Sequence, residues 1–344
     1  MKKNVFLALL MLVVAFSTVS FKKEVKENDL KDNGLNGMVK YIEIKTYSVS
    51  NNFGGIQKGK LLKYDFKSFN KDGNYLNIID GSWGFKDIYK YDSKGNRIEE
   101  SRYFSDGSLV FKYIYKYDSK GNMIEASIYN SDGSLGGKQI YKNDSKGNKI
   151  EESEYDSDGS LGGKDIYKYD SKGNKIEESY YNSDGSLREK YIIKYDSKGN
   201  KIEVSGYNSD GSLEGKYDFK YDSKGNKIEE SGYNSDGSLG SKDIYKYDSK
   251  GNIIEMSEYY SYGSLYTKYI YKNDSKGNWI EAIGKDAMEI PIRITERKIV
   301  YYGDADEYNY PEWDSPSYIG IKTQPAIESE IDVSTITPTE TPVY

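Results

Sequence analysis

Residues 89–96 read YKYDSKGN, and the last five letters of this stretch return along the chain at one fixed interval. DSKGN begins every 26 residues, at Asp92, Asp118, Asp144, Asp170, Asp196, Asp222, Asp248 and Asp274. A second motif, SDGS, lies between these copies and begins at Ser105, Ser131, Ser157, Ser183, Ser209 and Ser235. Self-similarity at one period is the signature of a repeat protein, in which each unit packs mainly against its neighbours.

Each 26-residue unit contains two turn signals, so we expect two strands in each unit. In DSKGN the aspartate suits the first position of a type I turn, and the glycine accepts the left-handed conformation that follows. The NSDGS stretch at residues 182–186 has the same pattern. No proline occurs between residues 86 and 283, as central strands require. The sequence therefore predicts an all-β, antiparallel β-hairpin meander with a 26-residue period.

The expected turn geometry also predicts a register. Tyr91 faces Arg97 across one turn, and Tyr103 faces Leu109 across the other. On this register one face is rich in tyrosine and the other alternates isoleucine with charge, so neither face is an ordinary core. We therefore expect an extended single sheet or a coiled open shell. Cross-strand ion pairs are expected at Glu100–Lys112, Glu152–Lys164, Glu178–Lys190 and Glu230–Lys242.

The flanks of the array differ from it in composition. Residues 1–20 combine Lys2 and Lys3 with an apolar run and small residues, the layout of a secretory signal peptide, with an uncleaved anchor as the alternative. We expect a charged linker at 21–37 and degenerate capping repeats at 38–85. The hairpin array follows at 86–283, and a capping strand at 284–303. Residues 304–344 are acidic and contain five prolines, which predicts a disordered tail.

Composition excludes several kinds of site. The 344-residue chain has no Cys, no His and a net charge of −6. Disulfides, thiolate nucleophiles, Ser-His-Asp triads and Cys- or His-ligated zinc are therefore excluded. The acidic balance argues against a nucleic-acid partner. We expect no catalytic residue, no metal site, no cofactor and no membrane span once the signal is removed, and the sequence leaves the oligomeric state open.

Rows of tyrosine are the candidate ligand-binding residues. One row recurs exactly one period apart and comprises Tyr103, Tyr129, Tyr155, Tyr181, Tyr207, Tyr233 and Tyr259. A second row comprises Tyr115, Tyr141, Tyr167, Tyr245 and Tyr271. Rings on an exposed sheet can stack on sugar rings. Cross-strand tyrosine pairs can equally hold a sheet together, and we favour this structural interpretation.

Other residues point less clearly to chemistry. Adjacent glutamates such as Glu151 and Glu152 project to opposite faces of a strand and recur along the array, which disfavours a unique pair of catalytic carboxylates. Residues 156–159 (DSDG) imitate part of a calcium-binding loop, but its first ligand and closing glutamate are missing, so we expect a turn. A hydrolase is therefore the least favoured class of function.

The YKYDSKGN unit, repeated at 115–122, 167–174 and 245–252, resembles the YD repeat of RHS-type proteins. The resemblance covers residues 60–302, and KGNWI at 276–280 is similar to the closing segment of small exported bacterial repeat proteins. The 26-residue period is longer than usual, and the chain is far shorter than toxin-carrying RHS proteins, so their delivery role is not implied.

The resemblance and the signal layout together predict an exported bacterial protein of the periplasm, the cell surface or the medium. We expect a non-enzymatic scaffold or binding module of the cell envelope. Its partner is expected to be a polysaccharide, a cell-wall polymer or a surface protein. Glycan or cell-wall polymer binding through the tyrosine rows is one alternative, and an inert structural or adhesive array is another.

Overall fold

The two turn motifs of each unit fold as hairpin turns in the computed structural model, which describes residues 28–52 and 55–304. In the first DSKGN copy the Asp92 amide donates to the Asn96 carbonyl oxygen, and the Gly95 amide donates to the Asp92 carbonyl oxygen, both at 2.9 Å. Gly95 has a φ of 74°, the left-handed conformation that favours glycine. Both oxygens of the Asp92 carboxylate accept hydrogen bonds within the turn, which explains the aspartate.

Twenty strands and one short helix account for the regular structure of the described residues. The helix is α2 (Asp29–Asp32). The strands are β1 (Val39–Asn52), β2 (Gly55–Phe69), β3 (Tyr75–Asp80), β4 (Phe85–Tyr91), β5 (Arg97–Phe104), β6 (Leu109–Tyr117), β7 (Met123–Asn130), β8 (Leu135–Asn143), β9 (Lys149–Asp156), β10 (Leu161–Tyr169), β11 (Lys175–Asn182), β12 (Leu187–Tyr195), β13 (Lys201–Asn208), β14 (Leu213–Tyr221), β15 (Lys227–Asn234), β16 (Leu239–Tyr247), β17 (Ile253–Tyr260), β18 (Leu265–Asn273), β19 (Trp279–Lys285) and β20 (Pro291–Tyr301).

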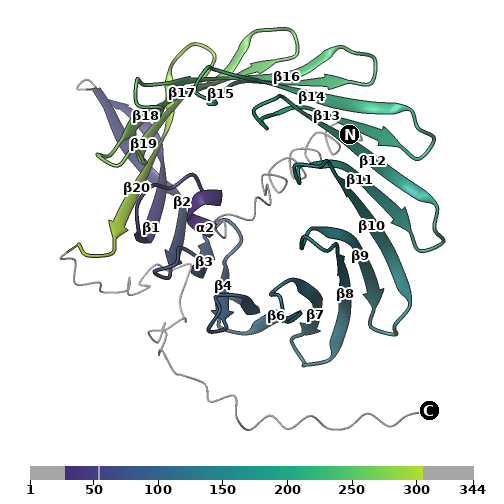
Figure 1. Ribbon diagram of the computed structural model, residues 1–344. Helices are drawn as coiled ribbons and strands as arrows, with labels where there is room; N and C mark the ends of the chain where they lie inside the picture. Colours follow the sequence, from purple (N-terminus) through teal and green to yellow (C-terminus); the bar gives the residue numbers. More distant parts are fainter. Residues whose placement is uncertain (1–27, 53–54, 305–344) are drawn as a thin grey trace, which may run out of the picture.

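The strands form one closed barrel (Figure 1). Each strand pairs antiparallel with the next one in sequence, which confirms the predicted all-β meander with two strands per unit. β1 also pairs with β20, from Val39–Tyr301 to Ser48–Arg293. The predicted extended sheet or open shell is therefore wrong, because the two flanks pair with each other and leave no free end.

Two β-bulges in every unit correct the predicted register. Tyr91 does face Arg97, but Lys90 then faces Glu99, so Ile98 is an extra residue. Tyr103 faces Leu109 as predicted, but Arg102 then faces Phe111, so Val110 is also extra. A slip of one residue moves every following side chain to the other face of the sheet.

The predicted ion pairs are wrong for the same reason, since Lys112 faces Ser101 rather than Glu100. In three of the four pairs the preceding glutamate takes the place of the predicted one. Glu151 pairs with Lys164, Glu177 with Lys190, and Glu229 with Lys242. A second lysine row contacts the same glutamates at 2.7–3.0 Å, in the pairs Lys90–Glu99, Lys116–Glu125, Lys142–Glu151, Lys168–Glu177, Lys194–Glu203, Lys220–Glu229 and Lys246–Glu255.

The tyrosine that precedes each turn aspartate ties its unit to the preceding one. The Tyr117 hydroxyl donates to the Arg97 carbonyl oxygen at 2.6 Å, across 20 residues of sequence. Tyr169, Tyr195, Tyr221 and Tyr247 make the equivalent bond. Where the unit carries asparagine instead, at Asn143 and Asn273, the side-chain amide donates in the same way. This bond between units explains why a tyrosine precedes the turn aspartate in most units.

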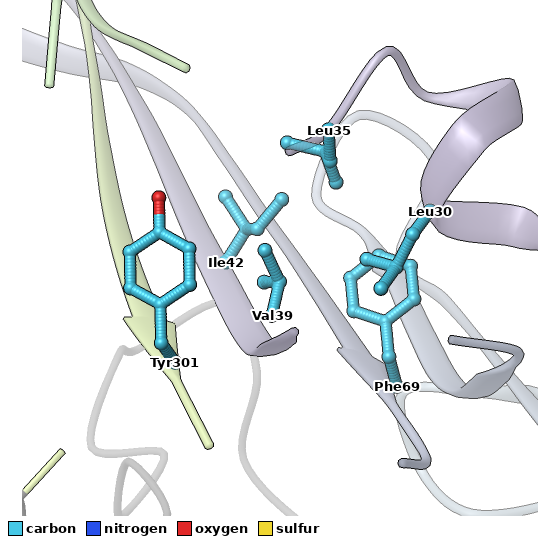
Figure 2. Close-up of a cluster of buried hydrophobic side chains, with 6 residues drawn as sticks. All are labelled: Leu30, Leu35, Val39, Ile42, Phe69 and Tyr301. Atoms are coloured by element: carbon cyan, nitrogen blue, oxygen red, sulfur yellow. The ribbon is translucent and has the colours of Figure 1, made fainter. Parts of the chain in front are cut away.

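Residues 28–37, at the end of the predicted linker, pack inside the barrel (Figure 1). Leu30 and Leu35 contribute to a buried cluster with Val39, Ile42, Phe69 and Tyr301 (Figure 2). The Asn36 amide donates to Asn278 Oδ1, and the Leu30 amide donates to the Gly73 carbonyl oxygen. The segment therefore joins strands on both sides of the β1–β20 seam.

The remaining predicted segments are described only in part. The signal peptide predicted at 1–20 and nearly all of the tail predicted at 304–344 lie outside the described residues. The predicted capping repeats at 38–85 contain β1, β2 and β3, and the capping strand predicted at 284–303 contains β20. β1 and β20 do not end an open array, because they close the barrel.

Candidate functional site

The position of α2 identifies the inner face of the barrel. α2 lies within the ring (Figure 1), and its Asp29 contacts Arg97 at 3.4 Å. The face that carries Arg97 is therefore the inner face. Exposure agrees with this assignment: the side chains of Lys175 and Glu178 on this face are 22% and 4% exposed, whereas the side chain of Lys116 on the opposite face is 62% exposed.

The predicted tyrosine row lies on the outer face, near the SDGS turns. All seven members, Tyr103, Tyr129, Tyr155, Tyr181, Tyr207, Tyr233 and Tyr259, are half-buried. Each faces a lysine on the preceding strand, in the order Lys86, Lys112, Lys138, Lys164, Lys190, Lys216 and Lys242. Members of the row lie two strands apart, about 9–10 Å, so their rings do not stack on one another.

The second predicted tyrosine row lies on the inner face and belongs to an ionic network. Lys149 Nζ lies 4.7 Å from the Tyr167 ring centre and 2.6 Å from Glu152 Oε2. In four units the extra residue at the bulge places a cation and the glutamate three residues later on one face. The pairs are Arg97–Glu100, Lys149–Glu152, Lys175–Glu178 and Lys227–Glu230. These rings are held by side chains of the barrel, which favours the structural interpretation of this row.

One belt of the inner face varies from unit to unit beside an outward-facing position that stays constant. We call variable belt the eight cross-strand pairs Asp87–Arg102, Tyr113–Ile128, Gln139–Glu154, Asp165–Tyr180, Tyr191–Gly206, Tyr217–Gly232, Asp243–Glu258 and Tyr269–Gly284. The residue immediately before the first member of each pair, which faces outwards, is lysine in every unit. Repeat proteins commonly concentrate their variation on the face that binds a partner.

The aromatic sector of the variable belt lies on β12–β14. Tyr191 and Tyr217 are 1% and 3% exposed, and they pack with Ile193, Val204 and Phe219. Tyr217 faces Gly232, where a Cβ atom would lie 2.9 Å from Tyr217 Cε1, so the glycine makes room for the ring. The Tyr217 hydroxyl oxygen is buried and has no hydrogen-bond partner among the described residues.

Acidic sectors of the variable belt lie on either side of the aromatic one. Burial, together with Glu152 and Glu154, raises the pKa of Asp165 to about 7. Burial, together with Glu230 and Glu258, raises the pKa of Asp243 to about 6. Burial and the neighbouring carboxylates both raise the pKa of each aspartate, and a bound cation would stabilise its charged form.

A cationic group also lies on this part of the inner face. Burial and the nearby Lys175 lower the pKa of Lys201 to about 8. Asp87 instead holds Arg102 through two hydrogen bonds of 2.7 and 2.8 Å, so the belt is balanced in charge at β4–β5. The inner surface therefore differs in charge from one sector to the next.

The variable belt was not among the residues predicted from the sequence. The signal was present, because aligning the 26-residue units shows a position that changes between Asp, Gln and Tyr beside an invariant lysine. The bulges hid its meaning, because they decide that this position faces the barrel interior. No three or more carboxylates in the described ranges are arranged to hold a metal ion. Within those ranges there is also no helix of the length and apolarity needed to cross a membrane.

No protein-family model and no curated protein matches the chain. Among solved structures, a porin-like protein from Bacteroides uniformis is similar at 12% identity and a TM-score of 0.37, over 76% of this chain and 98% of the other. A porin-like protein from Bacteroides vulgatus is similar at 10% identity and a TM-score of 0.28, over 78% of this chain and 100% of the other. The TcdB2-TccC3-Cdc42 structure is similar at 11% identity and a TM-score of 0.30 over 68% of this chain, which spans only 16% of that chain's length.

Proposed function

We propose that this chain is an exported, non-enzymatic repeat barrel of the bacterial cell envelope, whose variable belt binds a partner inside the barrel. The observation that carries the proposal is the unit-to-unit variation of the belt on the inner face, beside an invariant lysine on the outer face. The signal-peptide layout of residues 1–20 and the resemblance to YD repeats support export.

The chemistry of the belt favours a basic polypeptide segment as the partner. The half-buried ring of Tyr269 offers apolar surface on the belt, and the neighbouring pair offers Asp243 and Glu258. In a chain with alternating apolar and basic side chains, the apolar ones would pack against Tyr269 and the basic ones would neutralise the two carboxylates. The pairing of an inner cation with a glutamate recurs in four units, so no one pair is unique, which supports a binding role rather than a catalytic one.

A binding titration tests this function. A fluorescent hexapeptide of alternating lysine and leucine is titrated with the barrel, and its glutamate–leucine counterpart serves as the reference probe. We expect saturable binding of the basic peptide, weakened about tenfold by the double substitution Asp243→Asn and Glu258→Gln, which corresponds to one charge-assisted contact. Glu255→Gln, on the outer face of the same strand, is the matched control and should leave affinity unchanged. Equal binding of the two peptides would contradict the proposal.

Glycan binding through the outer tyrosine row stays the second candidate. The observation in its favour is the regular placement of a half-buried ring opposite a lysine in seven successive units. Replacing Tyr155, Tyr181 and Tyr207 by serine in one variant tests it against a panel of envelope polysaccharides. Loss of polysaccharide binding by a variant that still folds would favour glycan binding through the outer row. Unfolding of the variant would instead mark the row as structural.

A further inference from the structure

The β1–β2 hairpin projects beyond the rest of the barrel. Pairing of β1 with β20 ends at Ser48–Arg293, and pairing of β2 with β3 ends at Asp65–Asp80. β2 nevertheless begins ten residues earlier, at Gly55, and pairs there only with β1. Residues 55–62 are exposed without interruption. One edge of β2 therefore presents backbone donors and acceptors that no described strand covers.

The composition of this open edge is apolar and basic. Ile56, Leu61 and Leu62 are 47%, 45% and 59% exposed. Lys58 and Lys60 lie on the same strand, and Lys58 also contacts Glu296 of β20. An exposed strand edge with apolar side chains attracts a further strand, and its lysines disfavour an identical basic edge. The edge is thus suited to an extended segment that is apolar and acidic.

The chain contains such a segment outside the described residues. Residues 326–337 read AIESEIDVSTIT and lie between Pro325 and Pro338. Glu328, Glu330 and Asp332 alternate with apolar and hydroxyl residues, and no basic residue occurs in the segment. β-branched residues in period-two alternation, bounded by prolines, form the sequence signature of a strand. The acidic positions of such a strand would share one face.

The length of the intervening chain permits contact with the edge of the same molecule. The 21 residues from 305 to 325 can span up to about 70 Å when extended. β20 ends at Tyr301, at the opposite end of the barrel from the β1–β2 tip, and its 11 residues cover about 37 Å. The connection is therefore long enough to return along the barrel wall.

We propose that residues 326–337 add to the open edge of β2 as a further strand of the same chain. Backbone hydrogen bonds to β2 supply the attachment, in the manner of β-strand addition. The carboxylates of Glu328 and Glu330 lie opposite Lys58 and Lys60 and set the register. The added strand covers the edge, which prevents two barrels from pairing through it.

Cysteine cross-linking of the full chain tests this contact, and the absence of native cysteine makes each introduced pair unambiguous. Leu61→Cys is combined in turn with single cysteines at Ile327, Glu328, Ser329, Glu330, Ile331, Asp332 and Val333. We expect disulfide formation within one chain to alternate along this series, at least tenfold faster at every second position, because side chains of a strand alternate between faces. Lys116→Cys, on the outer wall, replaces Leu61→Cys in the matched control.

Each other outcome overturns the proposal. Cross-linking that does not alternate, or that equals the Lys116→Cys control, means that the segment does not pair with β2. Disulfides that form only between two chains mean that a second copy supplies the strand. A charge-reversal series gives independent evidence. Lys58→Glu with Lys60→Glu should reduce the cross-linking rate about tenfold, and adding Glu328→Lys with Glu330→Lys should restore it. Failure of that restoration would overturn the pairing of these charges.

Discussion

The hydroxyl of Tyr221 donates a hydrogen bond of 2.7 Å to the backbone carbonyl oxygen of Lys201, the residue that opens the hairpin 20 positions earlier. Equivalent bonds recur from unit to unit, so the tyrosine of the Tyr-Asp pair acts as a staple between neighbouring hairpins. The bond also explains why this position carries a hydrogen-bond donor, tyrosine or asparagine, along the array. Phenylalanine would fill the same space as tyrosine but could not donate.

Removing one of these staples should lower stability by a measurable amount. Tyr221→Phe keeps the ring and deletes the donor, so the free energy of unfolding should fall by about 1 kcal/mol. Urea denaturation followed by circular dichroism measures the change. Tyr207→Phe, in the outer row, is the matched control and should differ from the wild type by less than about 0.5 kcal/mol. Equal effects of the two substitutions would mean that the staple contributes nothing specific.

Gly232 should tolerate no side chain because the Tyr217 ring occupies the space above it. A methyl group there would meet Tyr217 Cε1 at 2.9 Å and Ser241 Oγ at 2.8 Å. Gly232→Ala should destabilise the barrel by about 1–3 kcal/mol and displace the Tyr217 ring. Near-ultraviolet circular dichroism would report the ring displacement, and urea denaturation the stability. In the Tyr217→Ala background, Gly232→Ala should lower the free energy of unfolding by much less than it does in the wild type. If the destabilising effects of the two substitutions simply add, the steric explanation is wrong.

Stability should depend on pH through Asp165. An aspartate in the unfolded chain has a pKa near 3.9, whereas that of Asp165 in the barrel is raised to about 7. Between these values the folded barrel binds more protons than the unfolded chain, so this residue makes stability fall as the pH rises from about 4 to 7. Asp165→Asn should therefore be more stable than the wild type at pH 8, by about 1–2 kcal/mol after allowance for solvent screening.

The difference between Asp165→Asn and the wild type should shrink towards pH 4, which urea denaturation across the pH range would show. Glu203→Gln is an opposite-sign control, because the hydrogen bond from Lys194 lowers the pKa of Glu203. Its carboxylate adds stability that is present above the unfolded pKa and is lost as the pH falls, so this variant should be less stable than the wild type at pH 8. If both variants were more stable, or both less stable, than the wild type at pH 8, the opposite directions of the two pKa shifts would be contradicted.

The short helix should contribute strongly to the stability of the seam. Leu30 is 6% exposed and contacts the cluster that contains Phe69 (Figure 2), so Leu30→Ala should cost about 2–5 kcal/mol. Leu135→Ala, at a residue that is 38% exposed, should cost less than about 1 kcal/mol. Hydrogen exchange at β1 and β20 would show whether the loss is local to the seam. Unchanged protection there would mean that the helix does not support closure.

The local elements of this fold could be predicted because each depends on residues close together in the chain. Asp92 and Gly95 specify a turn through hydrogen bonds that span four residues, and the absence of proline leaves every ladder amide available. The 26-residue period and the two strands of each unit follow from these signals. The Tyr103 row was also found as a row, although its face and its lysine neighbours were not.

The bulges at Ile98 and Val110 could not be predicted from the sequence. Each adds one residue to a strand and exchanges its two faces, and neither residue differs visibly from an ordinary strand residue. The variable belt could therefore be located along the sequence but not assigned to the barrel interior. The predicted register was wrong by one residue. It placed Glu100 opposite Lys112, whereas Glu100 faces Tyr113 in the barrel.

The sequence by itself determined the hairpins, their number and their antiparallel order, because turns and strands are set by short-range sterics and hydrogen bonding. Only the tertiary structure decided that the sheet closes. Closure rests on the pairing of Ile42 with Ile299 and their neighbours, across more than 250 residues, and on the packing of Leu30 inside the seam. Such contacts depend on the twist and curvature accumulated over all twenty strands, which no single unit encodes.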